Sequence, residues 1–360
     1  MLVVSKSFIE ALNLNKWLRR TDNTNMRIQI LALASLLISS CSTPKSLFQG
    51  GRATANEKSC TALVKHLFSS IEIDSGLPYT AEEVSSWIAK FKLVSADFNI
   101  SDTPQVKIHN QGKGTFFSAS ENTIYIQYVA NGKKIYQTLG HEYGHSVFHE
   151  FLKKNKNFDI EEAIAVLQKN DERQSELFSK KLMGETLSVS EVKELAKLDT
   201  NLERRIFFVQ ILKGMDELFA DTFDIVAFKN PRTMSEVLLV DLKKPLISIR
   251  DFKPTKIKDS MKEWDLLLSQ KKYNQYDLMA PVRWQIGELV KLADLDLLHQ
   301  QALVWKIAEL YSSELMLIVN KGDIAELPKF VEGMDSLDNV SSFIKKFNSR
   351  FNKNISDNLK

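Results

Sequence analysis

The chain has little of several features that whole classes of protein depend on. Its 360 residues include only two cysteines, Cys41 and Cys60, which excludes a framework of several disulfides. It has no apolar run of about 20 residues, the length that a membrane-spanning helix needs. Basic and acidic residues nearly balance, at 48 to 45, so we expect no nucleic-acid partner. Repeats of solenoid period are also missing, which excludes a repeat protein.

The overall composition is that of an ordinary globular protein. Hydrophobic residues make up 44% and charged residues 26% of the chain, which is enough apolar material for a sizeable core. The length fits one large domain or two small ones.

The segment from Met26 to Cys41, "MRIQILALASLLISSC", differs from the rest. It has one cation at Arg27, an apolar run from Ile28 to Ile38, and small residues that end in cysteine. An apolar run of this length is typical of a signal-peptide core. Its "ISSC" ending resembles the bacterial lipobox, in which cleavage leaves a lipidated cysteine, here Cys41. The alternative is a buried N-terminal helix that ends in an ordinary cysteine.

These observations divide the chain into three parts. Residues 1–41 are an N-terminal extension and lipoprotein signal peptide, with Met26 as the expected start. Residues 42–60 are rich in Ser, Thr, Gly, Ala and Lys and form a flexible tether. Residues 61–360 form the folded domain. We therefore expect a lipid-anchored protein of the cell envelope, and Ser42 after the cysteine resembles the pattern of outer-membrane lipoproteins.

The folded part begins with mixed structure and continues as helix. Thr80 and Glu83 have the spacing of a capping box, which predicts a helix start. The stretches 104–110 and 114–129 are rich in Val, Ile, Phe, Tyr and Thr and predict two or three strands of a small antiparallel sheet. Amphipathic stretches then follow almost to the end of the chain. They predict a helix over 188–198 that begins at a Ser188–Glu191 capping box, a long apolar helix over 202–228, and a later helix with Pro281 in its first turn. The expected fold class is α+β, mostly helical, with the small sheet before the helix that carries the histidines.

The stretch "LGHEYGHSVFHEF", residues 139–151, holds three of the six histidines of the chain. His141 and His145 lie four residues apart, so on a helix their imidazoles point the same way and can bind one ion. Glu142 can reach a water on that ion and act as general base, which is the arrangement of the zincin motif. Gly144 costs about 1 kcal/mol inside a helix and therefore predicts close packing of another element. The alternative is a pair of surface histidines on a solvated helix.

A catalytic zinc needs a third protein ligand. His149 lies about 12 Å along the helix from His141 and cannot readily share its ion, so we expect it to be a supporting or surface residue. Glu217, in the otherwise apolar "GMDELFADTFD", is the better candidate, because buried carboxylates must be paired or bound. Asp221, one turn later, would accept the free ring N–H of a ligand histidine, and Asp224 is a weaker supporting candidate. The alternative is that both carboxylates lie on a solvated stripe.

"HEYGH" followed by a distant "ELFAD" resembles the gluzincin peptidases of the HtpX and CaaX-prenyl-protease type. The resemblance is firm over residues 140–224 and implies a zincin-like metallopeptidase domain that binds Zn²⁺. By resemblance, His141, His145 and Glu217 hold the zinc, Glu142 is the base, and Asp221 supports a ligand.

That family often has a later His-Pro motif followed by an arginine. The corresponding stretch here, "YDLMAPVRWQIGEL", has Pro281 and Arg283 but no histidine. The group that stabilises the oxyanion is then open. Tyr276 can donate a hydrogen bond to an oxyanion. Arg283 can do the same or can brace a ligand carboxylate, and both residues can also be purely structural.

We therefore expect a zinc endopeptidase of the cell envelope, whose protein or peptide substrate pairs with the strand at 122–128. One alternative is a catalytically inactive metallopeptidase-like lipoprotein that acts as a binding or scaffold protein. Another is a zinc hydrolase that cleaves a non-peptide amide or ester. The substrate, the membrane that holds the anchor and any lid over the site are not determined by the sequence.

Overall fold

The computed structural model describes residues 71–359, except for 101–102, 111–113, 129–134, 235, 238–249, 255–256, 271–273, 320–323 and 325–339. These residues belong to one compact unit, Thr61–Lys360. The expectations for the signal peptide, the tether and Cys41 lie outside the described residues. Within the described part of the chain, no helix is both long and apolar enough to cross a membrane.

A small mixed sheet contains four strands, β1 (Ile71–Ile73), β2 (Gln105–His109), β3 (Phe116–Ser118) and β4 (Thr123–Gln127). The strand order is β1-β2-β4-β3, in which β2 pairs parallel with both β1 and β4, and only β3 is antiparallel. The expected wholly antiparallel sheet is therefore wrong. A tight turn at Asn122 reverses the chain between β3 and β4, whereas β1, β2 and β4 are joined by long connections that permit parallel pairing.

The sheet buries one face against helices, because apolar and polar residues alternate along its central strands. Val106 and Ile108 of β2 are buried, as are Ile124 and Ile126 of β4. Helix α5 (Ala81–Val94) starts at the expected capping box, in which Thr80 and Glu83 exchange hydrogen bonds with each other's backbone N–H. Its buried Val84, Ile88 and Phe91 join the same core.

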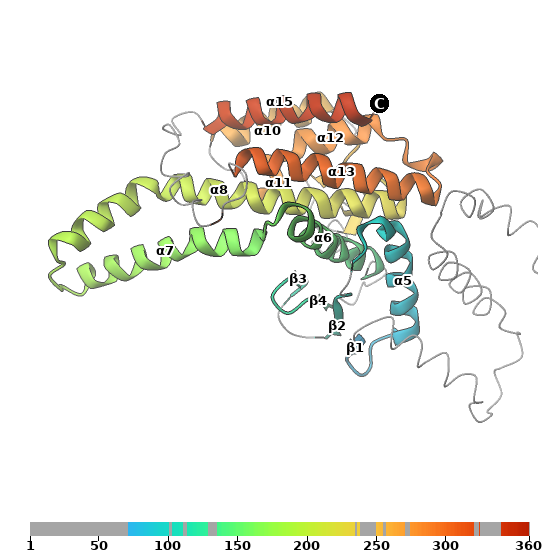
Figure 1. Ribbon diagram of the computed structural model, residues 1–360, viewed down its shortest axis with the longest axis horizontal. Helices are drawn as coiled ribbons and strands as arrows, with labels where there is room; N and C mark the ends of the chain where they lie inside the picture. Colours follow the sequence, from blue (N-terminus) through green and yellow to red (C-terminus); the bar gives the residue numbers. More distant parts are fainter. Residues whose placement is uncertain are drawn as a thin grey trace, which may run out of the picture. The chain divides into compact units, whose positions relative to one another are not determined.

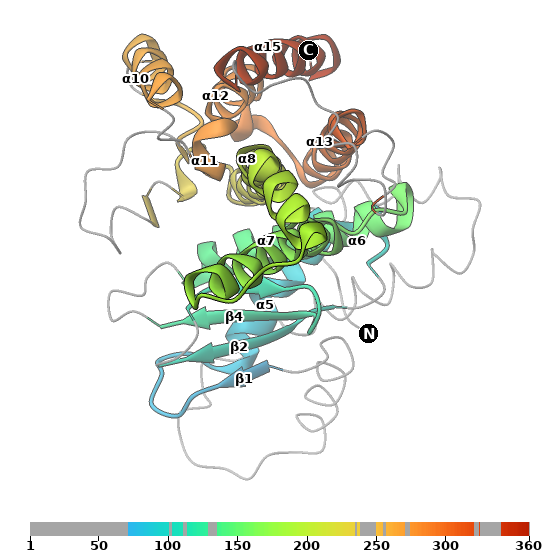
Figure 2. The ribbon, with the colours of Figure 1, turned by 90° about the vertical axis from the view of Figure 1, so that its left-hand side faces the viewer.

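Three long helices follow, α6 (Ile135–Lys156), α7 (Ile160–Leu182) and α8 (Val189–Phe228). The two helices expected at 188–198 and 202–228 are one continuous helix of 40 residues, α8, which starts at the expected Ser188–Glu191 capping box. No proline or glycine interrupts the stretch between them, so nothing in it ends the helix. Figure 2 shows α6 between the sheet and α8.

The remaining described helices pack on the other side of α8 (Figures 1 and 2). They are α10 (Ile257–Ser269), α11 (Gln275–Leu278), α12 (Ala280–Leu289), α13 (Leu297–Ile318) and α15 (Val340–Leu359). Pro281 lies in the first turn of α12, as expected, where its missing N–H costs nothing. α15 docks on the body through Phe351 and Ile355, both fully buried. Its core contact makes it part of the folded body.

The helices α6 and α8 approach closely at Gly144, as the sequence predicted. A Cβ at this position would lie 2.9 Å from Cα and 3.2 Å from the carbonyl oxygen of Ala220, and 3.2 Å from Cβ of Phe223. Backbone atoms of a neighbouring helix cannot rotate away, so only glycine fits without a shift of α8.

We predict that Gly144→Ala destabilises the protein. Helix propensity alone would make this change stabilising by about 1 kcal/mol. The clash with Ala220 reverses the sign, and we expect a loss of about 1–3 kcal/mol, the usual cost of overpacking. Chemical denaturation measures it, with Ser175→Ala on the exposed face of α7 as a control that should change stability by less than about 0.5 kcal/mol. A stabilised Gly144→Ala variant would contradict the close crossing.

Candidate metal centre

The nitrogens of two histidines and one carboxylate oxygen converge at the crossing of α6 and α8. Nε2 of His141 lies 3.2 Å from Nε2 of His145 and 3.3 Å from Oε2 of Glu217, and that oxygen lies 3.9 Å from Nε2 of His145. The two histidines are buried, and only 14% of the Glu217 side chain is exposed. Within the described residues, these three form the one group of His, Cys, Asp or Glu side chains that can hold a metal ion.

The spacing of the three ligand atoms fits a small ion. A tetrahedral ion with bonds of about 2.0–2.1 Å to its ligands separates those ligands by about 3.3 Å. Two of the three measured separations, 3.2 and 3.3 Å, match that value, and the third, 3.9 Å, needs a small rotation of Glu217. The sequence-predicted ligands are therefore brought together, and they can hold a metal ion.

Asp221 supports His141 from behind. Its Oδ1 lies 3.2 Å from Nδ1 of His141, a distance at which the ring N–H can donate to the carboxylate. Asp221 is fully buried and is held by two cations, Arg250 and Arg283. Burial alone would raise its pKa, but the two guanidinium groups and His141 hold that pKa well below the usual value. Asp221 therefore stays ionised and lies where it can orient the ring of His141.

The two arginines differ in position. Arg283 is fully buried and does not line the cavity; its Nε donates to Oδ2 of Asp221 at 2.9 Å and its Nη1 to the carbonyl of Tyr276 at 2.7 Å. This position favours the bracing role over the oxyanion role, with Asp221 rather than Glu217 as the braced carboxylate. Arg250 does line the cavity, and its Nη2 lies 3.3 Å from Oε2 of Glu217. The sequence reasoning missed Arg250, because a lone arginine in "ISIRDF" carries no motif.

Tyr276 lines the cavity. Its ring faces the Arg250 guanidinium, whose carbon is 4.5 Å from the ring centre. Burial and the nearby Glu217 carboxylate raise the pKa of Tyr276 to about 12, so the phenol keeps its proton at neutral pH. It therefore remains a hydrogen-bond donor toward the cavity. Asp224, the weaker supporting candidate, does not line the cavity and is buried against Gly140, where desolvation raises its pKa well above the usual value.

His149 is buried, so of the two expected positions, supporting or surface, the surface one is wrong. Its Nε2 lies 3.2 Å from Oδ2 of Asp216, and the Oδ1 of the same carboxylate lies 3.0 Å from Nδ1 of His145. His149 is not one of the ligand group, in agreement with its distance along the helix. The sequence reasoning also missed Asp216, although it directly precedes Glu217 in "MDEL".

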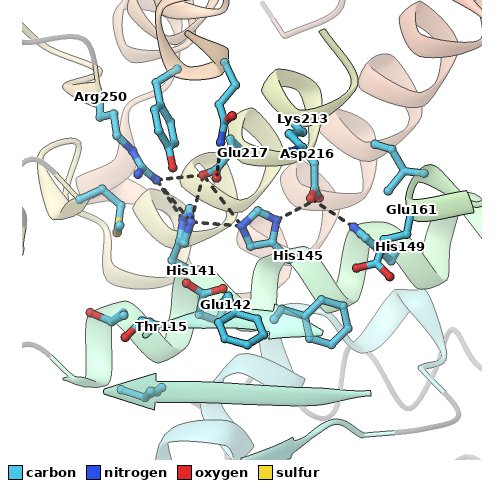
Figure 3. Close-up of a pocket in the computed structure, with 18 of the residues that line it drawn as sticks. Thr115, His141, Glu142, His145, His149, Glu161, Lys213, Asp216, Glu217 and Arg250 are labelled. Atoms are coloured by element: carbon cyan, nitrogen blue, oxygen red, sulfur yellow. Dashed lines mark hydrogen bonds and ion pairs between the residues drawn. The ribbon is translucent and has the colours of Figure 1, made fainter. Parts of the chain in front are cut away.

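Figure 3 shows the cavity that these residues line, about 750 Å³ in volume. Glu142 lies on the sheet side of the two histidine rings, between them and Thr115. Burial raises the pKa of Glu142, and the two histidines oppose that rise. The cavity walls come from the sheet region, α6, α7, α8 and later segments of the chain. The sheet region contributes Thr115, Phe116, Phe117, Ile126 and Gln127, α6 contributes Ile135, Thr138 and the three histidines, and α7 contributes Ile160, Glu161, Ile164, Ala165 and Gln168. Lys213, Asp216 and Glu217 come from α8, and Met234, Val237, Arg250, Gln275 and Tyr276 come from the segments after it.

Comparison with protein-family models, with curated proteins and with solved structures finds no match. The proposed function therefore rests on the fold and on the geometry of the site.

We predict that metal binding at neutral pH releases protons. Burial alone would lower the pKa of His141, but Asp221 and Glu217 raise it to about 10; Asp216 likewise raises the pKa of His145. A metal must displace these protons, so its apparent affinity should rise with pH, by about tenfold per unit for each proton released, until the pKa near 10 is passed.

Titration calorimetry of Zn²⁺ binding in two buffers of different ionisation enthalpy measures this release. At least one proton per ion is expected at pH 7, and fewer from Asp221→Asn, in which the pKa of His141 should fall. A heat that is the same in both buffers would contradict the prediction.

Proposed function

We propose that this chain is a zinc-dependent endopeptidase of zincin type. The main observation in support is that the ligand group His141, His145 and Glu217 lines one cavity together with Glu142 and the edge strand β3. A zinc ion held by that group would lower the pKa of a water and polarise a scissile carbonyl. A ligand set, a base and a strand that can hold an extended peptide are the three parts that peptide hydrolysis needs.

Glu142 is the residue that moves the protons in this proposal. Its position beside both histidines puts its carboxylate next to the nucleophilic water, from which it takes a proton. The raised pKa of Glu142 helps it to hold that proton and then to give it to the leaving amine. Tyr276, which keeps its own proton, donates a hydrogen bond to the developing oxyanion. Arg250 adds a positive charge on the same side of the cavity.

The substrate strand must differ from the one expected. The stretch 122–128 contains β4, which pairs with β2 on one side and β3 on the other, so its edges are occupied. β3 is the edge strand next to the cavity, and Thr115 to Phe117 line it. We propose that an extended peptide pairs with the outer edge of β3, which no other strand of the described residues occupies and which can accept a further strand.

The direction of that peptide follows from the strand directions. Phe117 contacts His149 with ring centres 5.6 Å apart, and Thr115 lies toward His141 (Figure 3). A peptide antiparallel to β3 therefore runs from the His149 end of the cavity to the His141 end. The residue after the scissile bond then meets the wall near Ile135 and Thr138.

The closer assignment, to gluzincins of the HtpX and CaaX-prenyl-protease type, rests on "HEYGH" and "ELFAD" and belongs to the same proposal. So does the location. The lipid anchor at Cys41, the cell envelope and a protein or peptide substrate there depend on residues 26–41, which lie outside the described part of the chain.

We predict that Glu142→Gln lowers peptide hydrolysis by about 10²- to 10⁴-fold, the usual contribution of a general base. Gln is close to Glu in size, and Glu142 is not one of the three ligands, so bound zinc should stay near one ion per chain. Mass-spectrometric digestion of a broad peptide library, with and without a chelator, measures activity, and elemental analysis measures zinc. Glu162→Gln, the same acid-to-amide change on the exposed face of α7 outside the cavity, is the control and should keep the activity.

Two outcomes would overturn the proposal. If the wild-type chain binds zinc but cleaves no peptide of the library, the inactive binding protein is favoured. If hydrolysis is confined to non-peptide amides or esters, the chain is a zinc hydrolase of another class.

A further inference from the structure

Asp216 lies between two histidines, of which one belongs to the candidate ligand group and the other does not. Its Oδ1 is 3.0 Å from Nδ1 of His145 and its Oδ2 is 3.2 Å from Nε2 of His149 (Figure 3). Its side chain is only 19% exposed. His145 is a candidate metal ligand, whereas His149 is not. One carboxylate therefore connects a ligand ring to a ring outside the ligand group.

The contact of Asp216 repeats, at the second ligand ring, the contact that Asp221 makes at the first. In both rings, Nδ1 faces a carboxylate of α8, at 3.0 Å for His145 and 3.2 Å for His141, while the two Nε2 atoms face each other at 3.2 Å. A neutral imidazole has one N–H and one lone pair. A carboxylate at Nδ1 selects the tautomer with the hydrogen on that nitrogen and leaves the lone pair of Nε2 free for a metal.

The two carboxylates are held in different ways. Asp221 is fully buried between Arg250 and Arg283, whereas Asp216 lines the cavity. Among the contacts that the structure gives for the described residues, Nε2 of His149 is the group that forms an ion pair with the second oxygen of Asp216, at 3.2 Å. His149 is in turn packed edge-on against Phe117 of β3, at 5.6 Å between ring centres. A path of contacts thus runs from the edge strand through His149 and Asp216 to His145.

We propose that Asp216 is a positioning residue of the metal centre, which fixes His145 with Nε2 toward Glu217, and that His149 holds Asp216 in place. This inference rests on the proposed metal site and deepens it. It assigns a role to the third histidine of "HEYGHSVFH" that is not ligation. It also links β3, the cavity wall along which the substrate would pair, to the orientation of the ligand His145.

The test compares the zinc affinity of full-length variants by competition with a chromophoric chelator. Asp216→Asn keeps one acceptor oxygen but loses the charge, so it can no longer serve both rings fully. We expect it to weaken zinc binding by about 10- to 100-fold, the usual effect of removing a partner of a ligand histidine. Asp216→Ala should weaken binding at least as much. The matched control, Glu161→Gln, changes a carboxylate in the α7 wall of the cavity and should leave the affinity unchanged.

A spectroscopic readout separates positioning from a general loss of stability. In ¹⁵N spectra of histidine-labelled, zinc-loaded protein, the wild type should show His145 with hydrogen on Nδ1 and metal on Nε2. Asp216→Asn should shift the Nδ1 signal of His145 while the signals of His141 stay in place. A purely structural role would lower the unfolding temperature of the variant without weakening zinc binding and without shifting the Nδ1 signal of His145.

A second variant keeps the inference testable if Asp216→Asn fails to fold. His149→Leu preserves apolar packing against Phe117 but removes the ring that holds Asp216. It should weaken zinc binding by a smaller factor than Asp216→Asn, and the two effects should be less than additive when combined. Affinities of Asp216→Asn and His149→Leu equal to that of Glu161→Gln would overturn this inference alone. A wild-type chain that binds no zinc would overturn the proposed function.

Discussion

The close crossing of α6 and α8 at Gly144 and Ala220 is the constraint on which the site depends. Without a Cβ at position 144 the two backbones approach so closely that short side chains from both helices meet. His141 and His145 lie one turn apart on one side of this contact, and Glu217 faces them from α8, less than one turn before Ala220. A wider crossing would separate the two imidazoles from the carboxylate, because α8 carries the third ligand on a short glutamate side chain.

The same crossing concentrates charge in a buried place. Asp216, Glu217 and Asp221 come from one turn and a half of α8, and the guanidinium groups of Arg250 and Arg283 oppose them. Three carboxylates against two guanidinium groups leave negative charge that the histidine rings compensate by holding protons, since the carboxylates raise the pKa of His141 to about 10 and also raise the pKa of His145. Buried charge is costly unless it is compensated, so this arrangement favours a further cation at the ligand group. The site is thus preorganised for a positive ion by the sequence "MDELFAD" as a whole.

Most of the helices, and the residues that converge, could be predicted from the sequence, because local rules decide both. The capping boxes at Thr80 and Ser188 lie where the spacing of side chains put them. The pairing of His141 with His145 follows from helix geometry, and a carboxylate such as Glu217 on an apolar helix needs a partner. The parallel pairing of β1, β2 and β4 is different, because alternation of apolar residues gives the burial of a strand but not the direction of its neighbour.

Arg250 and the roles of Asp216 and His149 could not be read from the sequence for a related reason. Each depends on the distance between segments that lie far apart in the chain: Arg250 meets Asp221 across 29 residues, and Asp216 lies 71 positions after His145. Spacing along one helix says nothing about such contacts. The edge position of β3 is also a property of the whole sheet and could not be deduced from the sequence of β4.

The central claim is that two imidazoles and one carboxylate bind a single metal ion. The zinc K-edge X-ray absorption spectrum of the loaded full-length chain, compared with that of Glu217→Ala, tests this most directly. The account predicts about one zinc per chain with two imidazole nitrogens at about 2.0–2.1 Å and a carboxylate oxygen at about 2.0–2.2 Å, the oxygen contribution decreasing in Glu217→Ala. Sulfur ligands, or identical spectra for the two proteins, would contradict it.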